Sequence, residues 1–182
     1  MAVHSSMVPL GTFLPDQTLS DVTGRPFNLH QVRGSGVLVV MWSANHCPYV
    51  QHLEQALAAL AGEFADRPVS FVAICSNDVV AYPDDDLAGL SAQAARAGWT
   101  FPYLVDPDQT VAHDFGAVCT PDFFVYGFEG QLLYRGAFDE STPRNDVPVT
   151  GDLLRSAISL VVAGRPVPEP QRPAMGCAIK WR

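Results

Sequence analysis

The sequence VLVVMWSANHCPY, from Val37 to Tyr49, decides the fold of this chain. Its first part, Val37 to Trp42, is an uncharged apolar run rich in valine. Such a run is typical of a strand buried on both faces of a parallel sheet. The polar turn SANH follows, then Cys47-Pro48, where a helical pattern begins. We therefore expect Cys47 at the junction between a central strand and a helix.

A cysteine at such a junction lies among backbone N–H groups that have no partner within the helix, at the positive end of the helix dipole. This setting stabilises the thiolate, which is the reactive form of cysteine. A single cysteine in a core is more often an inert packing residue. The position of Cys47 at a strand-to-helix turn favours the other interpretation, a redox-active nucleophile.

The composition is that of a globular protein, 48% hydrophobic and 16% charged over 182 residues. The net charge of −8 argues against nucleic acid or an anionic membrane as the main partner. No apolar run approaches the ~20 residues of a membrane span, and the N-terminus lacks the basic start and apolar core of a signal peptide. We expect a cytoplasmic protein whose 4 scattered cysteines are free or transiently oxidised. The oligomeric state is left open.

Hydrophobic periodicity and turn residues predict the order of elements along one domain spanning residues 1–182. Strands connected through helices pair in parallel, and a closing hairpin adds an antiparallel edge, so the predicted class is α/β with a mixed central sheet flanked by helices. The predicted elements are an arm (1–14), a hairpin (16–29), strands (37–42, 69–75, 123–126, 132–136), a short extended piece (99–105), helices (48–66, 86–97, 110–115, 152–162) and an extended tail (164–182) whose apolar end docks through Lys180 and Trp181.

The carboxyl ends of the central strands meet at one edge of such a sheet, which is where α/β folds usually bind ligands. Cys47 follows the first of these strands, and Asn77 and Asp78 follow the second. The two polar residues either line the site or cap the next segment. The acidic run Asp84 to Asp86 is interpreted as a solvated helix start rather than a metal cluster.

The sequence resembles the thioredoxin superfamily, and within it the AhpC/TSA-type, peroxiredoxin-like branch that carries a Cys-Asn-His-Cys-Pro segment. The resemblance implies a thioredoxin-like fold in which Thr120-Pro121 is a cis-proline loop facing Cys47. It also implies that Arg135 is a charge near the site, although the residue alone fits a solvated strand position. The matching segments are Asn45-His46-Cys47-Pro48-Tyr49, Cys75-Ser76-Asn77-Asp78, Cys119-Thr120-Pro121, Tyr134-Arg135-Gly136 and Gly176-Cys177-Ala178-Ile179-Lys180-Trp181.

Ala44 departs from the pattern of that branch, which has the first cysteine of a Cys-x-x-Cys pair at this position. A thioredoxin attacks with the first thiol and resolves with the second, so a local dithiol cannot form here. The remaining spacing resembles that of a peroxiredoxin, in which a threonine occupies the position of Ala44 and the later cysteine, here Cys47, is the one that attacks the peroxide. Ala44 has no hydroxyl for a peroxide, and Thr120-Pro121 stands near where a peroxiredoxin places an arginine. A second thiol must come from elsewhere.

Two cysteines compete to supply that thiol. Cys119, two residues before the proline, is the predicted resolving partner, and Cys177 on the docked tail is its rival. A disulfide requires Cα atoms within roughly 7 Å. His46 either stabilises the thiolate or points to solvent, and Cys75 is interpreted as a core residue. The candidate site comprises Cys47, Cys119 and Cys177 for catalysis, lined by Asn45, His46, Pro48, Asn77, Thr120, Pro121 and Arg135.

These expectations describe a thiol-dependent redox protein with one active-site cysteine, either a thiol–disulfide oxidoreductase or a peroxiredoxin-like peroxidase. Its partners would be a small thiol, disulfide or peroxide substrate and an external thiol reductant, with no cofactor. A metal site is not predicted, because His52 does not share a helix face with Cys47 and no paired ligand spacing occurs. The alternative function is a binding or structural module that kept the fold and lost its dithiol chemistry.

Overall fold

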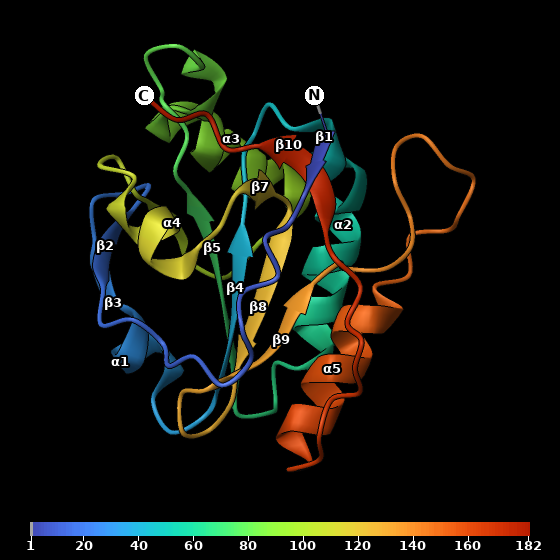
Figure 1. The fold of residues 1–182 in the computed structure, drawn as a ribbon. Coiled ribbons are helices and arrows are strands. Elements are labelled where there is room, and N and C mark those ends of the chain that lie inside the picture. Colours follow the sequence, from blue (N-terminus) through green and yellow to red (C-terminus); the bar gives the residue numbers. More distant parts are fainter. Residues whose placement is uncertain (1) are drawn as a thin grey trace.

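The computed structural model describes residues 2–182, which fold around a seven-stranded mixed sheet (Figure 1). Its strands are β2 (Thr18–Asp21), β3 (Pro26–Asn28), β4 (Val37–Trp42), β5 (Val69–Cys75), β6 (Tyr103–Val105), β8 (Asp122–Tyr126) and β9 (Leu132–Gly136). They lie in the order β3-β2-β6-β5-β4-β8-β9. Strands β4, β5 and β6 are parallel and the two hairpins are antiparallel, as the sequence predicts; the antiparallel pairs β4–β8 and β2–β6 were not predicted.

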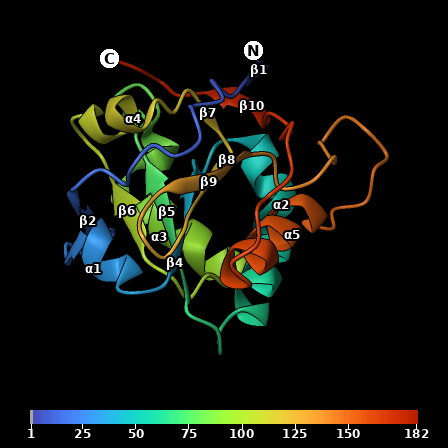
Figure 2. The ribbon, with the colours of Figure 1, turned by 60° about the horizontal axis from the view of Figure 1, so that its bottom comes forward.

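Helices cover both faces of the sheet (Figures 1 and 2). They are α1 (Leu29–Arg33), α2 (Pro48–Glu63), α3 (Leu87–Ala97), α4 (Thr110–Phe115) and α5 (Asp152–Val162), with the short 3-10 helix η1 (Pro83–Asp85) before α3. Buried residues of α2, α3 and α5 join one hydrophobic cluster, and those of α1 and α4 join another. Across residues 2–182, no helix combines the length and the apolar character needed to cross a membrane.

Strand β4 forms the centre of both clusters. Val37, Val39 and Met41 pack into the cluster beneath α2, α3 and α5, whereas the alternate residues Leu38, Val40 and Trp42 pack into the opposite one. No residue of the strand is more than 2% exposed. The predicted strand is confirmed, and its burial on both faces accounts for an apolar residue at every position.

A second, three-stranded sheet closes the edge at which β4 ends. It consists of β1 (Ala2–His4), β10 (Met175–Ala178) and β7 (Cys119–Thr120), in the order β1-β10-β7. The sequence predicts an irregular arm and an extended tail, yet each contributes a strand. The reason is their antiparallel pairing with each other across the whole length of the chain. Met1 of the predicted arm lies outside the described residues.

The remaining predicted elements agree closely with the structure, apart from two short ones. The predicted hairpin forms through β2 and β3, but Leu29 already begins α1, because the Asn28 side chain accepts a hydrogen bond from the Gln31 N–H and caps that helix. Strand β7 was not predicted, since two residues give no periodic pattern. Helices α4 and α5 and strands β5 and β9 have the bounds predicted from sequence.

Candidate active site at the junction of strand β4 and helix α2

Cys47 is the residue that caps the N-terminus of α2. Its backbone is extended, with φ −80° and ψ 114°, and Pro48 occupies the first turn of the helix with its own side chain exposed. The Cys47 side chain has no exposed surface. In its protonated form, its thiol donates to the Thr120 carbonyl at 3.1 Å. The cysteine thus lies where the sequence predicts, against the loop that precedes β8.

The peptide bond between Thr120 and Pro121 is cis, as the resemblance implies. Thr120 is buried, and its hydroxyl has no hydrogen-bond partner among the described residues. A buried polar group without a partner is costly, so such groups usually serve a further interaction. The neighbouring Cys47 sulfur is a suitable acceptor once it is ionised.

Cys177 reaches the site through β10. In the ladder between β10 and β7, Cys177 stands opposite Thr120. The approach is close because Gly176 has no side chain; a Cβ at that position would clash with the Thr120 carbonyl. Cys177 is half-buried, and no disulfide joins it to Cys47. The structure therefore brings a second thiol, from the far end of the chain, to the same loop that contacts Cys47.

The surroundings of Cys47 favour its thiolate. A hydrogen bond from the Cys177 thiol is the largest cause, and it lowers the pKa of Cys47 to about 6 although burial acts in the opposite direction. The Thr120 side chain and the backbone N–H groups of Cys177 and Val50 contribute as well. The same interaction with Cys47, together with burial, raises the pKa of Cys177. At neutral pH, Cys47 is thus the ionised thiol and Cys177 the protonated one.

We expect a titration of the thiolate absorbance in the ultraviolet to show one ionisation near pH 6 in the reduced protein. An unperturbed cysteine ionises near pH 8.5, so the two cases are well separated. The Cys47→Ser variant should lose this ionisation, and Cys75→Ala should keep it. A reduced protein whose first thiol ionises only above pH 8 would contradict this assignment.

Cys119 and Cys75 are both deeply buried. Burial is the largest cause that raises the pKa of Cys119, and the nearby carboxyl of Asp122 adds to it. The one contact recorded for the Cys119 sulfur is with the Pro121 carbonyl at 4.0 Å. Burial raises the pKa of Cys75 to about 12, and its side chain belongs to the core. Both thiols are therefore protonated at neutral pH.

Asp122, which directly follows the cis-proline, was not singled out from the sequence. Its carboxyl is 1% exposed, and neither oxygen has a hydrogen-bond partner among the described residues. Burial raises its pKa well above the usual range. Burial thus disfavours a negative charge at Asp122.

Asp85 is the second residue that sequence reasoning missed. The sequence predicts a solvated run from Asp84 to Asp86, but the Asp85 side chain is buried. Its oxygens bind His46 Nδ1 at 2.6 Å and Asn77 Nδ2 at 2.8 Å, so it links the two loops that follow β4 and β5. Asp86 does cap α3, by accepting from the Gly89 N–H, as an acidic helix start should. A helix start needs only one acidic cap, so the presence of three consecutive acidic residues was the only local sign that one of them has another role.

The other predicted lining residues divide between site and scaffold. Asn45 holds its turn in place, donating to the Asp84 carbonyl at 2.7 Å and accepting from Arg96 at 3.0 Å. Arg135 stands opposite Phe124 in the ladder between β8 and β9, so its side chain lies on the face away from Cys47. There it donates to the Val8 carbonyl at 2.7 Å. The structure thus does not bring Arg135 to the site.

The tail beyond β10 docks, as predicted. The Lys180 backbone N–H donates to the Asn77 side chain at 2.8 Å, and the Asp78 N–H donates to the Lys180 carbonyl at 2.9 Å. Trp181 stacks on His113, with ring centroids 4.3 Å apart. These contacts fix Cys177 from its C-terminal side, because only a few residues separate it from the anchor.

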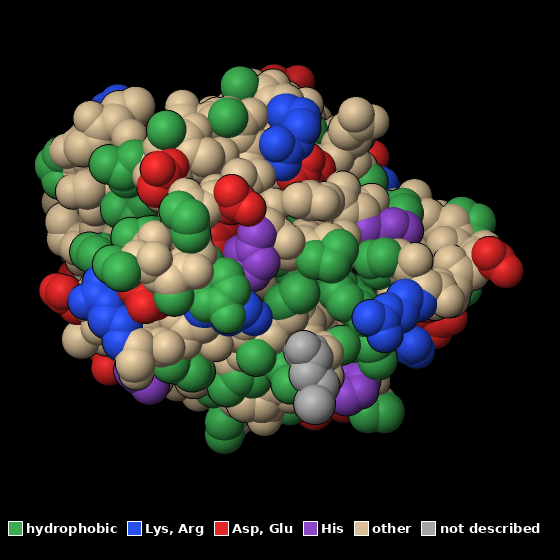
Figure 3. All heavy atoms as spheres, turned by 90° about the horizontal axis from the view of Figure 1, so that it is seen from above, with side chains coloured by type: hydrophobic (Ala, Val, Ile, Leu, Met, Phe, Trp, Pro, Cys, Tyr) green, Lys and Arg blue, Asp and Glu red, His purple; other side chains and the backbone are tan. Residues whose placement is uncertain are grey.

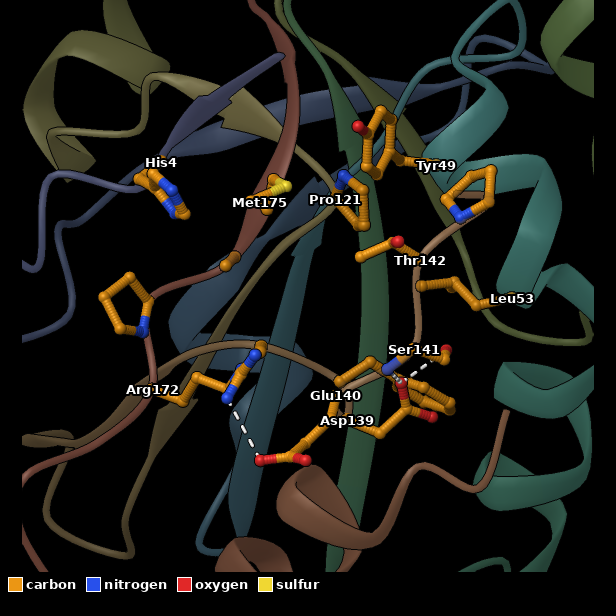
Figure 4. A pocket seen from close by; sticks show the side chains of 15 residues that line it. His4, Tyr49, Leu53, Pro121, Asp139, Glu140, Ser141, Thr142, Arg172 and Met175 are labelled. Atoms are coloured by element: carbon orange, nitrogen blue, oxygen red, sulfur yellow. Dashed lines mark hydrogen bonds and ion pairs between the residues drawn. The ribbon is translucent and has the colours of Figure 1, made fainter. Parts of the chain in front are cut away.

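A cavity opens beside the cis-proline (Figure 4). Pro121, Tyr49 and Leu53 line one side of it, and the ion pair between Arg172 and Glu140, 3.0 Å long, lies across from them. The face above the strand ends presents hydrophobic side chains with histidine and charged side chains between them (Figure 3). Pro121 follows Thr120, whose carbonyl contacts the Cys47 thiol, so the cavity adjoins the loop that packs against Cys47.

The family is decided by a comparison with protein-family models: the model described as AhpC/TSA family matches residues 10–135. This chain belongs to the AhpC/TSA family. The matched part of this AhpC/TSA protein contains Cys47, Cys119 and Pro121, whereas Cys177 lies beyond it. No curated protein matches the chain. Membership of the family supports a thiol redox role.

Solved structures match this AhpC/TSA protein along its length. An uncharacterized conserved protein from Geobacillus kaustophilus is 43% identical, with a TM-score of 0.97, covering 100% of this chain and 97% of that one. A hypothetical protein from Sinorhizobium meliloti 1021 is 42% identical, with a TM-score of 0.95 and 98% coverage of both chains. Peroxidoxin BcpB from Mycobacterium tuberculosis is 21% identical, with a TM-score of 0.64, covering 84% of this chain and 97% of that one. The predicted thioredoxin-like fold is confirmed.

Proposed function

We propose that this AhpC/TSA protein is a thiol–disulfide oxidoreductase in which Cys47 attacks the substrate and Cys177 resolves the intermediate. One observation carries the proposal: Cys47 and Cys177 both lie against Thr120 of the cis-proline loop, and their pKa values are shifted in opposite directions. Ala44 removes the local dithiol of the sequence pattern, and Cys177 supplies the missing thiol in space rather than in sequence.

The proposed reaction has two steps. In the first, the Cys47 thiolate attacks one sulfur of a substrate disulfide, forms a mixed disulfide and releases one substrate thiolate, which takes up a proton. In the second, Cys177 loses its proton and attacks the Cys47 sulfur, which forms the internal disulfide and releases the second substrate thiol. The substrate disulfide is reduced and the two cysteines are oxidised. An external dithiol returns them to the reduced state.

The pKa values fit this order of events. Cys47 is ionised at neutral pH and attacks first, while Cys177 is held protonated as long as it donates to the Cys47 thiolate. When the mixed disulfide forms, that negative charge disappears, and the pKa of Cys177 falls toward its ordinary value. The second thiol is therefore activated only after the first has reacted. Four free thiols suit a reducing compartment, as in the cytoplasm.

The Cys47 side chain has no exposed surface, so the first attack requires a local opening of the residues packed over it. Strand β10 is the natural candidate because it belongs to a small sheet of three short strands and carries Cys177. The cavity beside Pro121 then receives the part of the substrate that adjoins its disulfide. Its mixture of apolar walls and one exposed ion pair suits a peptide or a small organic disulfide.

The pairing is tested by mass spectrometry of the protein after stoichiometric oxidation. We expect a disulfide between Cys47 and Cys177, and we expect Cys177→Ser to accumulate a mixed disulfide with a small disulfide substrate. The Cys119→Ser variant is the matched comparison and should still form the internal disulfide. A bond between Cys47 and Cys119 would instead restore the resolving role that the sequence predicts for Cys119.

Reduction of a peroxide is the second candidate, favoured by the unpartnered Thr120 hydroxyl beside the Cys47 sulfur. A hydroxyl there can hydrogen-bond a peroxide oxygen, as the resemblance to peroxiredoxins implies for a threonine elsewhere in the site. Parallel assays of peroxide consumption and disulfide reduction separate the two reactions. The absence of both, with an ordinary Cys47 pKa, would favour the non-catalytic module.

A further inference from the structure

Asp85 is a buried carboxylate that the reaction described so far does not use. Its oxygens accept four hydrogen bonds: from the backbone N–H of Asn45 at 2.7 Å and of His46 at 3.2 Å, from Asn77 Nδ2 at 2.8 Å, and from His46 Nδ1 at 2.6 Å. Burial raises the pKa of Asp85, but these hydrogen bonds prevail and lower it. The carboxylate therefore stays ionised at neutral pH and is hydrogen-bonded to the imidazole of His46.

The contact with Asp85 decides which nitrogen of His46 is available. Because an ionised carboxylate can only accept, Nδ1 must carry a proton and donate it to Asp85. Nε2 is then the nitrogen that takes up or releases a second proton. The hydrogen bond to Asp85 is also the largest cause that raises the pKa of His46. The ring is 19% exposed, so that proton can still exchange with water.

The imidazole is held on a second side by Tyr82. The two rings stack with centroids 5.0 Å apart and planes 21° apart. The Lys180 ammonium lies 5.4 Å from the Tyr82 ring, on the docked tail. A ring fixed by a hydrogen bond in its plane and by stacking on its face keeps one orientation. Such fixation is what general acid catalysis requires of a proton donor.

His46 precedes Cys47 directly in the chain, in the turn before α2. The charged and titratable groups that face the imidazole are Asp85 from η1, Cys47 from the start of α2 and Lys180 from the tail. Asp85 and the Cys47 thiolate favour the imidazolium, and Lys180 opposes it. The two negative groups raise the pKa of His46, although burial and Lys180 act in the opposite direction.

We propose that His46 is the general acid of this site, and that Asp85 and Tyr82 are its positioning residues. The inference rests on the proposed thiol–disulfide exchange. As the Cys47 thiolate forms its bond to one substrate sulfur, the bond between the two substrate sulfurs breaks. The departing sulfur takes the electron pair of that bond, and His46 Nε2 transfers its proton to it. His46 becomes neutral and recovers its proton from water, while its other proton stays on Nδ1, in the hydrogen bond to Asp85.

The leaving group provides the test. An aliphatic thiolate is a poor leaving group and gains from protonation, whereas an aromatic thiolate with a low pKa leaves without it. We would measure the first, single-turnover step at pH 7 with two neutral probes, hydroxyethyl disulfide and dipyridyl disulfide. Each rate is divided by the thiolate fraction of Cys47, taken from the ultraviolet absorbance of the same variant. This division removes any change in the pKa of Cys47 itself.

We expect His46→Gln to react about 100-fold more slowly with hydroxyethyl disulfide and at an unchanged rate, within about threefold, with dipyridyl disulfide. His52→Gln is the matched control, because His52 also lies near the site but binds Ser141 Oγ at 3.1 Å, and both rates should be kept. Asp85→Asn retains a hydrogen-bonding side chain but removes the charge. It should show the same selective loss, with the rate falling at a lower pH as the imidazole deprotonates.

Three outcomes would overturn the inference. An equal loss with both probes would mean that His46 only tunes the sulfur electrostatically, and no loss with either would mean that it has no part in the step. A pH profile that is identical in Asp85→Asn and in the native protein would remove the positioning role of Asp85. If the native protein reacts with neither probe, the proposed function itself fails. A loss of rate in the His46 variant alone concerns only the role of His46.

Discussion

Replacing Cys47 with serine should lower the rate of disulfide reduction by about 1,000-fold or more, the range expected when a nucleophile is removed. Serine has nearly the same shape, so it fits the fully buried site without disturbing β4 or α2. Its hydroxyl is not ionised at neutral pH and does not attack sulfur. The measurement is the single-turnover loss of free thiols from the reduced protein mixed with a small disulfide.

The matched control for this prediction is Cys75→Ala. It also removes a buried thiol from the same face of the sheet, but one whose pKa burial raises to about 12. We expect it to keep the native rate at some cost in stability. If Cys47→Ser retained the rate, the nucleophile would have to be another cysteine, and the helix N-terminus would have only a structural role.

Local sequence patterns were sufficient for the elements that carry the site. The apolar run Val37 to Trp42 predicts β4, and the three- and four-residue spacing after Pro48 predicts α2, because each signal lies within one short window. These two elements also predict the role of Cys47, because it lies at the junction between them, where the helix N-terminus stabilises a thiolate. The resemblance added the cis-proline, which no composition or periodicity specifies.

The rest of the site depends on contacts between distant segments, and local patterns do not encode them. Asp85 appears solvated in sequence because its three partners come from loops that follow two different strands. Cys177 belongs to a strand only because residues 2–4 and 119–120 are there to pair with it. For the same reason Arg135 could not be separated from the site until its strand partner, Phe124, showed the face it occupies.

Ala44 shows how the two levels combine. In the sequence, alanine at this position means that the second thiol of a local pair is missing, which argues against catalysis. In the fold it is completely buried, and its carbonyl accepts from the Cys47 N–H at 3.4 Å in the turn that starts α2. A cysteine is therefore unnecessary for the turn itself. The thiol that completes a pair lies across the cis-proline loop, where β10 brings Cys177.

Gly176 is therefore the position at which a small change should have the largest effect on both stability and chemistry. A methyl group there would clash with the backbone carbonyl of Thr120, and neither strand has a flexible side chain that could yield. Gly176→Ala must push β10 away from β7. We expect the free energy of unfolding to fall by about 1–3 kcal/mol, as in overpacked sites. The pKa of Cys47 should rise from about 6 as the Cys177 thiol moves away.

The control for this change is Gly62→Ala in α2, where an added Cβ meets no atom within 4 Å. Alanine favours a helix over glycine, so this variant should gain up to about 1 kcal/mol and leave the pKa of Cys47 unchanged. Chemical denaturation and the ultraviolet thiolate titration, applied to both variants, measure the two effects separately. A loss of stability in Gly176→Ala without a rise in the pKa of Cys47 would mean that β10 supports the fold but not the thiolate. Such a result would remove Cys177 as the group that keeps Cys47 ionised.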